Sequence, residues 1–234
     1  MTHIPLSSLY TADHGWLKSR FHFSFADYHD RTNMHYGTLR VMNDDIIQPH
    51  TGFDEHPHKD MEIITYIIRG ELTHQDSMGN KEHLGRGSVQ YLSAGTGITH
   101  SETYEGYDYV HLIQTWIYPQ SKGIEPVYGS KVFSFEDRHN KWLHLIAPSH
   151  TPNIINIYQD ANMYVSELDK NRTLTFELGE KRQLYVKVME GKANINGIVF
   201  EQGDAAKVSG EDLHVEALRD VHILLVEMAK NSTL

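Results

Sequence analysis

Short runs of apolar and β-branched residues alternate with polar turns along most of this 234-residue chain. Between residues 21 and 25, aromatic and polar side chains alternate, a pattern typical of a half-buried strand. Similar runs that stop at glycine, proline or Asn/Asp predict further strands over residues 37–42, 62–68, 72–76, 88–92, 110–118, 163–168, 174–178, 184–189 and 221–228. The first of these should end at Asn43-Asp44-Asp45, because Asn and Asp favour turns. Evenly spaced short strands with glycine turns predict an all-β sandwich or barrel.

A faint internal repeat indicates two copies of one barrel. Residues 66–72 resemble residues 186–193, and the glycine-led triplet at 87–89 has a counterpart at 203–205. The length suffices for one large all-β domain or two small ones, and the repeat favours two in tandem.

The boundary between the two copies is predicted by composition. Polar residues from 134 to 140 indicate a connection. We therefore expect an N-terminal domain over residues 1–133 and a C-terminal domain over residues 141–234. Hydrophobic residues make up 39% of the chain, which is enough for packed cores and excludes an intrinsically disordered protein.

Two pairs of potential metal ligands stand at i and i+2 in the first copy: His56 with His58, and His100 with Glu102. In an extended strand, alternate side chains leave the same face. Two such strands facing each other inside a barrel would make a site of three histidines and one carboxylate. In a chain with seventeen histidines, about one His-x-His pair is expected by chance. The evidence for a metal site therefore comes from the two ligand pairs together.

The second copy offers no matching ligand set. The repeat places Glu177 and Gly179 where the first copy has His56 and His58, and the other pair falls near Glu216 and Leu218. The second barrel is then either structural or a wall of the first barrel's pocket.

Charge and composition exclude several classes of protein. The formal net charge of −10 disfavours binding to nucleic acid or to anionic membranes. The chain has no cysteine, so disulfides, thiolate catalysis and cysteine-bound iron–sulfur clusters are excluded, and a metal must use His, carboxylate or water. Neither a signal peptide nor an apolar run of membrane length is visible, which makes a cytoplasmic protein the expectation.

Around the ligand pairs, the sequence resembles the cupin superfamily, and the pirin family within it. His56, His58, Glu62 and Gly70 fit the first cupin motif. Gly87 and His100 fit the second, with Ser93 in place of the usual proline. The pirin-like stretches are residues 14–16, 38–41, 56–62, 74–80 and 93–102. The resemblance is dense over residues 14–118 and thin beyond them.

The resemblance implies a bicupin fold with one mononuclear metal ion in the N-terminal barrel. Pirin ligands carry over to His56, His58, His100 and Glu102, whereas many other cupins use the glutamate at the position of Glu62. The implied ion is divalent, Fe(II) first, with Ni, Cu, Mn or Zn also suited to these ligands. Pirin-like proteins are associated with quercetin 2,3-dioxygenase activity in bacteria and with transcriptional co-regulation in eukaryotes.

These implications give two competing functions, and a third possibility is an enzyme whose quercetin turnover is incidental to another substrate. The first is a metal-dependent dioxygenase that opens a flavonol-like ring with O₂, in which Glu102 or Glu62 takes the hydroxyl proton. The second is a non-catalytic, metal-dependent module that binds another protein. A deep pocket opening onto the metal would favour the enzyme, and a buried metal under a flat apolar patch the module. A monomer is the family-based expectation.

The sequence also suggests residues at the pocket entrance. Phe53, Asp54, Gln114 and Trp116 neighbour or face the ligand strands and are candidate substrate contacts. Asp54 would serve equally as a turn residue, and Trp116 as plain core. His74 and His111 lie on predicted strands, and a structural role is the favoured interpretation of each.

Overall fold

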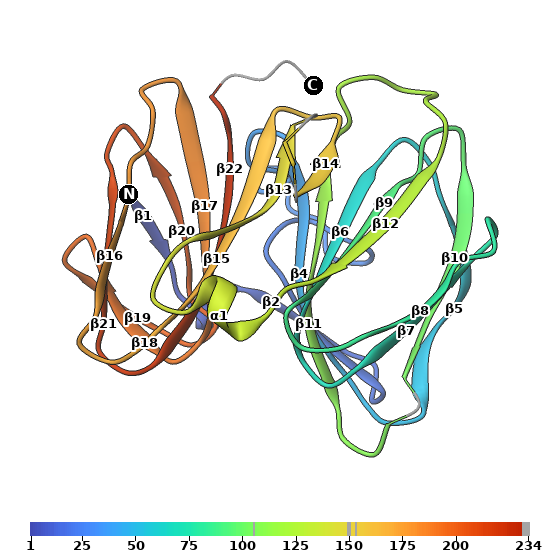
Figure 1. Ribbon diagram of the computed structural model, residues 1–234, viewed down its shortest axis with the longest axis horizontal. Helices are drawn as coiled ribbons and strands as arrows, with labels where there is room; N and C mark the ends of the chain where they lie inside the picture. The colour runs from blue at the N-terminus through green and yellow to red at the C-terminus, as the bar shows by residue number, and fades with distance from the viewer. Residues whose placement is uncertain (105, 149–150, 153, 231–234) are drawn as a thin grey trace. The chain divides into compact units, whose positions relative to one another are not determined.

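The structure is a computed structural model that describes residues 1–104, 106–148, 151–152 and 154–230. The chain divides into two compact units (Figure 1). One unit comprises Tyr10–Phe133, and the other combines Met1–Leu9 with Ser134–Leu234. The first nine residues therefore group with the C-terminal part, a division that the repeat in the sequence does not suggest. No helix within the described residues is long and apolar enough to cross a membrane.

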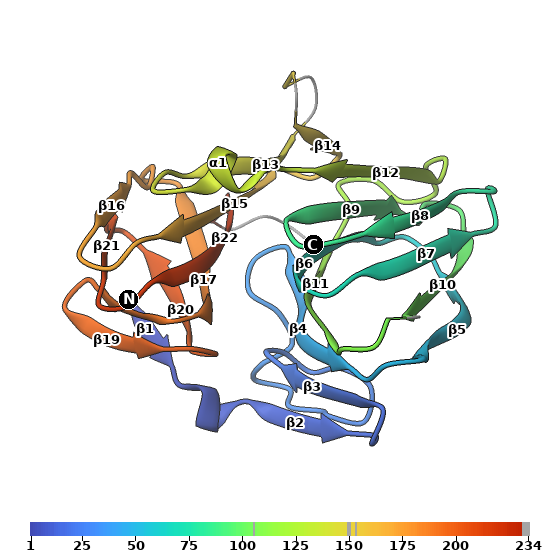
Figure 2. The ribbon, with the colours of Figure 1, turned by 60° about the horizontal axis from the view of Figure 1, so that its bottom comes forward.

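The unit formed by residues 10–133 is a barrel of two antiparallel sheets (Figure 2). The larger sheet contains, in spatial order, β12 (Val127–Val132), β9 (Ser88–Ser93), β6 (Glu62–Arg69), β11 (Val110–Ile117), β4 (Leu39–Ile47), β3 (Leu17–Phe21) and β2 (Tyr10–Asp13). The smaller sheet contains β5 (Thr51–His58), β10 (Ile98–Tyr104), β7 (Leu72–Asp76) and β8 (Lys81–Leu84).

Inside this barrel, a polar layer lies between two apolar clusters. Along β6, Ile63 belongs to one cluster and Ile67 to the other, with Thr65 between them on the same face. The polar layer continues across the larger sheet, because Gln114 pairs with Thr65 on one neighbouring strand and with Asn43 on the other. On the smaller sheet, the ligand candidates of β10 occupy the same interval, between Ile98 and Tyr104 of the two clusters. The apolar clusters thus close the barrel on either side of the polar groups.

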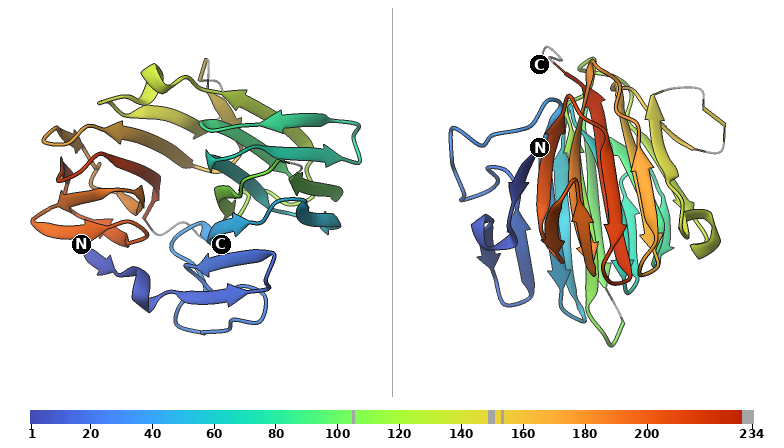
Figure 3. Two further views of the ribbon diagram at one scale, coloured as in Figure 1. Left: turned by 90° about the horizontal axis from the view of Figure 1, so that it is seen from below. Right: turned by 90° about the vertical axis from the view of Figure 1, so that its left-hand side faces the viewer.

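The second unit has the same sheet architecture (Figure 3). Its larger sheet contains β1 (Thr2–Ile4), β20 (Ala205–Ser209), β17 (Arg182–Glu190), β22 (Val221–Ala229), β15 (Ala161–Leu168), β13 (Leu143–Pro148) and β14 (Ile155–Ile157). Its smaller sheet contains β16 (Thr173–Phe176), β21 (Leu213–Ala217), β18 (Lys192–Ile195) and β19 (Ile198–Glu201). The helical elements are η1 (Leu6–Ser8) and α1 (Phe135–Arg138), and α1 begins at a Ser134–Asp137 capping box. The prediction of two tandem all-β barrels is confirmed.

The edge strand of the second barrel comes from the start of the chain. Thr2 pairs with Lys207 and Ile4 with Ala205, so β1 lies beside β20 as β12 lies beside β9 in the first barrel. In Figure 3 the dark-blue first strand lies beside orange strands that follow it by most of the chain. The expected C-terminal domain over 141–234 ends with residues 231–234, which lie outside the described residues.

Two strand predictions are wrong at the level of residues. A strand was expected over residues 21–25, but β3 lies earlier in the chain and ends at Phe21. The strand expected to stop at Asn43-Asp44-Asp45 continues to Ile47. The turn preference of these residues is overridden by partners on neighbouring strands. Ser19 donates its hydroxyl to the Asp45 carboxylate, and His111 Nε2 lies 2.6 Å from Asp44 Oδ1.

Candidate metal centre

The two ligand pairs lie on neighbouring strands, not on strands facing each other across the barrel. In the antiparallel pairing of β5 with β10, His100 lies directly opposite His56, and His58 lies opposite Ile98. Directly opposite residues point to the same face of a sheet. The smaller sheet alone therefore brings the three histidines together on the inner face of the barrel.

The three imidazoles converge. Their candidate donor atoms lie within 4.8 Å of one another, and the Nε2 atoms of His58 and His100 are 3.0 Å apart. The ring centroids of His56 and His100 are separated by 4.5 Å, and those of His58 and His100 by 4.9 Å. His56 Nδ1 lies 2.8 Å from the Asp54 carbonyl oxygen, which orients the ring and leaves Nε2 for a metal ion.

Glu102 lies two residues beyond His100 on β10 and shares its face of the sheet, beside an irregularity in the pairing with β5. Between His100 and Glu102 the register shifts by one residue, so that Glu102 lies opposite Phe53 and β5 carries one extra residue. Glu102 groups with His100 and His74 as a set of potential ligands whose donor atoms lie within 4.8 Å of one another. Gln90 Nε2 donates to Glu102 Oε1 at 3.1 Å, and Gln114 Nε2 donates to Oε2 at 3.0 Å. Two amides from the larger sheet therefore fix this carboxylate.

The chemistry of these donors fits a divalent first-row metal ion. Burial, followed by the neighbouring histidines, lowers the pKa of His58 to about 4 and that of His100 to about 3. At neutral pH both rings are therefore uncharged, which is the form that binds a metal. Three imidazoles and one carboxylate match the preferences of iron, nickel, copper, manganese and zinc. The site can hold a metal ion, but the donor atoms do not determine which of these five metals binds.

The lowered pKa values predict acid sensitivity of the metal-free protein. In the unfolded chain these histidines take up protons near pH 6.5, whereas in the folded protein they resist until about pH 4. Their contribution to stability is thus fully present above pH 6.5 and is lost as the pH falls toward 4. We expect metal-free protein to show a lower urea midpoint at pH 5 than at pH 7. The double variant His58→Asn, His100→Asn should show a smaller decrease, and an equal decrease would contradict this assignment.

A cavity of about 460 Å³ opens onto the ligand side chains His56, His58 and Glu102. The cavity lies within the first barrel, and five Phe and Trp side chains contribute to its wall. Its rings are Trp16, Phe21, Phe25, Phe53 and Trp116. The His58 ring packs against Trp116 at 5.0 Å between centroids. Ligand pockets in proteins typically measure about 300–1,000 Å³, so this cavity can admit a small aromatic molecule.

Three of the four candidate pocket residues line this cavity: Phe53, Gln114 and Trp116. Trp116 Nε1 donates to Gln114 Oε1 at 3.0 Å, which links the cavity wall to the carboxylate of Glu102. Asp54 does not line it. The extra residue in β5 leaves the Asp54 side chain exposed, and Asp54 lines a different hollow together with His50.

Glu62 lies outside the site, so its position does not support either role considered for it, metal ligand or base. Along β6, Ile63 and Thr65 point into the barrel, so Glu62 points to the opposite face of the same sheet. The side chain is fully buried there, and the Tyr91 hydroxyl donates to Glu62 Oε1 at 2.7 Å.

The two further histidines differ in position. His74 is fully buried on the inner face beside His100, stacked on Tyr128 at 4.4 Å, with Nε2 3.2 Å from Asp76 Oδ2. His111 pairs with Asp44 on the opposite face of the larger sheet, away from the cavity. A structural role holds for His111, whereas His74 adjoins the metal centre.

Sequence reasoning missed four polar residues of the barrel interior: Ser19, Asn43, Asp45 and Gln90. Ser19, Asn43 and Asp45 line the cavity. The signal that could have found two of them is alternation, because residues 41, 43, 45 and 47 of one strand share a face. The turn preference of Asn and Asp concealed it.

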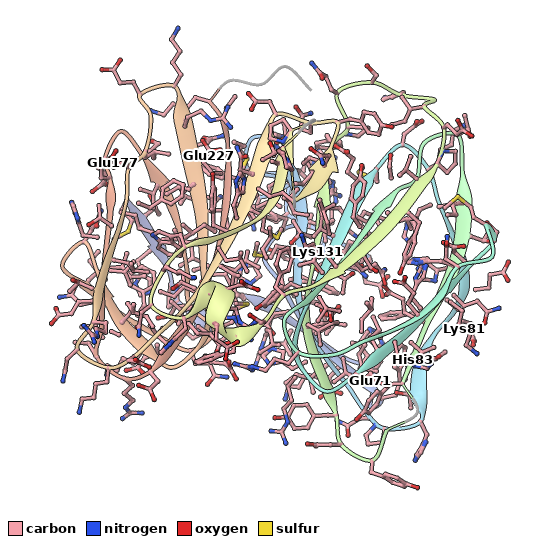
Figure 4. All side chains as sticks on the ribbon, viewed as in Figure 1. Glu71, Lys81, His83, Lys131, Glu177 and Glu227 are labelled. Carbon is pink, nitrogen blue, oxygen red and sulfur yellow. The ribbon has the colours of Figure 1, made fainter. Side chains whose placement is uncertain are left out.

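In the second barrel the corresponding strands carry apolar inner residues. By sheet order, β16 and β21 occupy the places of β5 and β10. Leu174 on β16 and Val215 on β21 pair with each other and pack in the core of this barrel. Glu177 lies exposed just beyond β16 (Figure 4). Within the described residues, groups of potential ligands close enough to share an ion occur in the first barrel alone.

Fold and site together define a tandem cupin protein with one candidate metal centre. The pirin family model matches residues 5–117, and a model described as the quercetinase C-terminal cupin domain matches residues 139–228. A pirin-like protein of Caulobacter vibrioides is 42% identical over 96% of this chain and 98% of the relative. The chain belongs to the pirin family, as its motifs indicate.

Two further relatives bear on function. A protein of Escherichia coli K12 named quercetin 2,3-dioxygenase is 38% identical over 93% of this chain and 94% of its own length. The crystal structure of the bacterial pirin YhhW from Escherichia coli, in complex with nickel(II), superposes with a TM-score of 0.90. It is 35% identical and covers 97% of this chain and 98% of that protein.

Proposed function

We propose that this protein is a mononuclear metal-dependent dioxygenase that opens the ring of a flavonol-like polyphenol with O₂. The observation that carries the proposal is the aromatic-walled cavity that opens onto His56, His58 and Glu102. An aromatic substrate entering it would meet the candidate ligands directly. The relatives named quercetin 2,3-dioxygenase support the substrate class.

In this proposal His56, His58, His100 and Glu102 hold the ion, with Fe(II) as the metal. A bound divalent ion would supply Lewis-acid stabilisation of an ionised hydroxyl and the redox chemistry that O₂ requires. The donor atoms of His56, His58 and His100 already lie close together, and Glu102 belongs to a second close group that shares His100. Gln90 and Gln114 hold Glu102 by its two oxygens and orient this single anionic ligand.

The aromatic wall would position the substrate. Trp16 and Phe53 make an edge-to-face pair at 5.1 Å, and Phe25 and Trp116 make another at 5.3 Å. Flat aromatic rings pack well against such pairs, and the wall excludes water from the reacting centre. In the overall reaction both oxygen atoms of O₂ enter the products, the heterocycle opens and carbon monoxide leaves.

The cavity also favours catalysis over a purely protein-binding module. A module that senses the metal requires no large hollow beside the ligands. Here the hollow and the donor set are continuous, with His56 and His58 belonging to both. The same cavity gives the metal centre a route to small molecules.

Anaerobic reconstitution with single metals tests the proposal. Protein is stripped of metal, loaded in turn with Fe(II), Ni, Cu, Mn or Zn, and then mixed with quercetin and O₂. We expect oxygen uptake matched by carbon monoxide release with at least one metal, and faster with Fe(II) than with Zn. No uptake with any metal, in protein that binds one equivalent, would contradict the proposed activity.

A further inference from the structure

A polar strip crosses the aromatic cavity on the sheet that bears no ligand. Asn43 and Asp45 of β4 and Ser19 of β3 line the cavity side by side, because Ser19 pairs directly with Asp45 in the sheet. Asp45 is 3% exposed and Asn43 4% exposed. A carboxyl and an amide that are this deeply buried are costly unless they bind something.

Only part of the hydrogen-bonding capacity of this strip is used within the described residues. The Ser19 hydroxyl donates to Asp45 Oδ1, and Oδ2 receives no hydrogen bond from the described residues. The Asn43 Oδ1 atom is buried without a hydrogen-bond partner. Both atoms are acceptors, so the strip matches a ligand that donates hydroxyl groups, not a second carboxylate or a phosphate.

The other proton acceptors of the cavity are engaged. Glu102 receives an amide donor on each oxygen, and His56 and His58 are proposed metal ligands. His14 also lines the cavity but is exposed to solvent. Asp45 is therefore the buried carboxyl of the cavity that the metal does not use.

We propose that Asp45 is the residue that accepts the hydroxyl proton of the substrate, and that Asn43 binds a second hydroxyl beside it. The inference rests on the proposed function and assigns its proton transfer to a residue outside the ligand set. The substrate O–H bond breaks, its electron pair stays on the substrate oxygen, and the proton forms an O–H bond with Asp45 Oδ2. A divalent ion bound at the candidate centre would attract the resulting oxyanion.

The electrostatics of Asp45 suit this role. Burial raises the pKa of its carboxyl to about 7, the Ser19 hydrogen bond acts in the opposite direction, and the charges of Asp44 and Glu102 raise it further. A base with a pKa near the working pH is largely deprotonated and still has enough proton affinity to accept a proton from the substrate. Of the other titratable groups nearby, Glu102, His56 and His58 face the same cavity from β10 and β5. Asp44 lies on the reverse face of β4 with His111.

The first test reads substrate ionisation without turnover. Metal-loaded protein is mixed anaerobically with quercetin at pH 7.5, and the absorbance band of the ionised flavonol is recorded. Wild type should show the ionised form. Asp45→Asn should retain one equivalent of metal and bind quercetin in its neutral form, whereas an ionised spectrum in this variant would overturn the proposal.

The second test reads the pH profile of kcat/KM. Asp45→Asn should lower kcat/KM by about 10²–10⁴-fold and remove the acidic limb near pH 7. Ser19→Ala should move this limb to higher pH, because it removes a hydrogen bond that stabilises the carboxylate. Asp44→Asn is the matched control on the same strand, and it should retain the limb, unchanged or at slightly lower pH. An unchanged profile in Asp45→Asn would overturn the assignment.

The two tests separate the inference from the function on which it rests. If wild type ionises quercetin but consumes no O₂, the dioxygenase proposal fails and the role of Asp45 in binding stands. If wild type turns over quercetin and Asp45→Asn does so equally well, Asp45 is not the proton acceptor and the dioxygenase proposal stands.

Discussion

Replacing Glu102 with Gln is expected to abolish turnover while the fold survives. The change preserves volume but removes the single carboxylate of the candidate ligand set. The new amide keeps only one acceptor oxygen, so either Gln90 Nε2 or Gln114 Nε2 would face another NH2 group and lose its hydrogen bond. Because loss of an outer partner alone typically lowers metal affinity about 10–100-fold, loss of the ligand should exceed that range. Metal content after gel filtration and oxygen uptake with quercetin measure the effect.

The second barrel supplies a matched control for this variant. Glu216 lies on β21, the strand that corresponds to β10, and points away from the core. Glu216→Gln should leave metal content, oxygen uptake and the melting temperature unchanged. Full activity with bound metal in Glu102→Gln would remove Glu102 from the ligand set.

Substituting Gly52 with Ala should push β5 away from β10 and thereby displace the candidate metal ligands on these strands. A Cβ atom at Gly52 would lie 2.2 Å from the backbone oxygen of Glu102 and 2.6 Å from Thr103 Cα. Both neighbours are backbone atoms of the paired strand, so the strands themselves must move. Such overpacking costs about 1–3 kcal/mol, and the displacement of one ligand strand should lower metal affinity about tenfold or more.

Gly129 offers the control for this steric argument. It lies in β12 of the same barrel, and an added Cβ would meet no atom within 4 Å. Gly129→Ala should therefore change the free energy of unfolding by less than about 0.5 kcal/mol. Urea titrations and competitive metal titrations of both variants measure the two effects. Equal stability and equal metal affinity of the two variants would show that the close approach at Gly52 is not rigid.

The sequence was most informative where strand alternation alone decides the outcome. His56 with His58, and His100 with Glu102, occupy alternate positions of real strands, so each pair shares a face. Which strands would be neighbours could not be read from spacing. The two pairs lie side by side in one sheet, because β5 and β10 are hydrogen-bonded partners.

Other residues were misplaced for two physical reasons. The extra residue in β5 reverses the alternation locally, which turns Asp54 outward. Glu62 fits the cupin motif by spacing, yet Ile63 and Thr65 of the same strand point inward. A motif does not reveal whether the odd-numbered or the even-numbered residues of a strand face the core. Asp45 was missed because its turn preference is outweighed by a hydrogen bond with Ser19, which is distant in sequence but lies on the neighbouring strand.

The strand at the start of the chain has a consequence for biosynthesis. Thr2 is synthesised long before its partner Lys207. β1 stays unpaired while the first barrel is synthesised and closes. Meanwhile β20 would present an open edge, a site of intermolecular pairing, until the leading segment returns to it. A tag fused directly to β1 should therefore impair maturation of the second barrel more than assembly of the first.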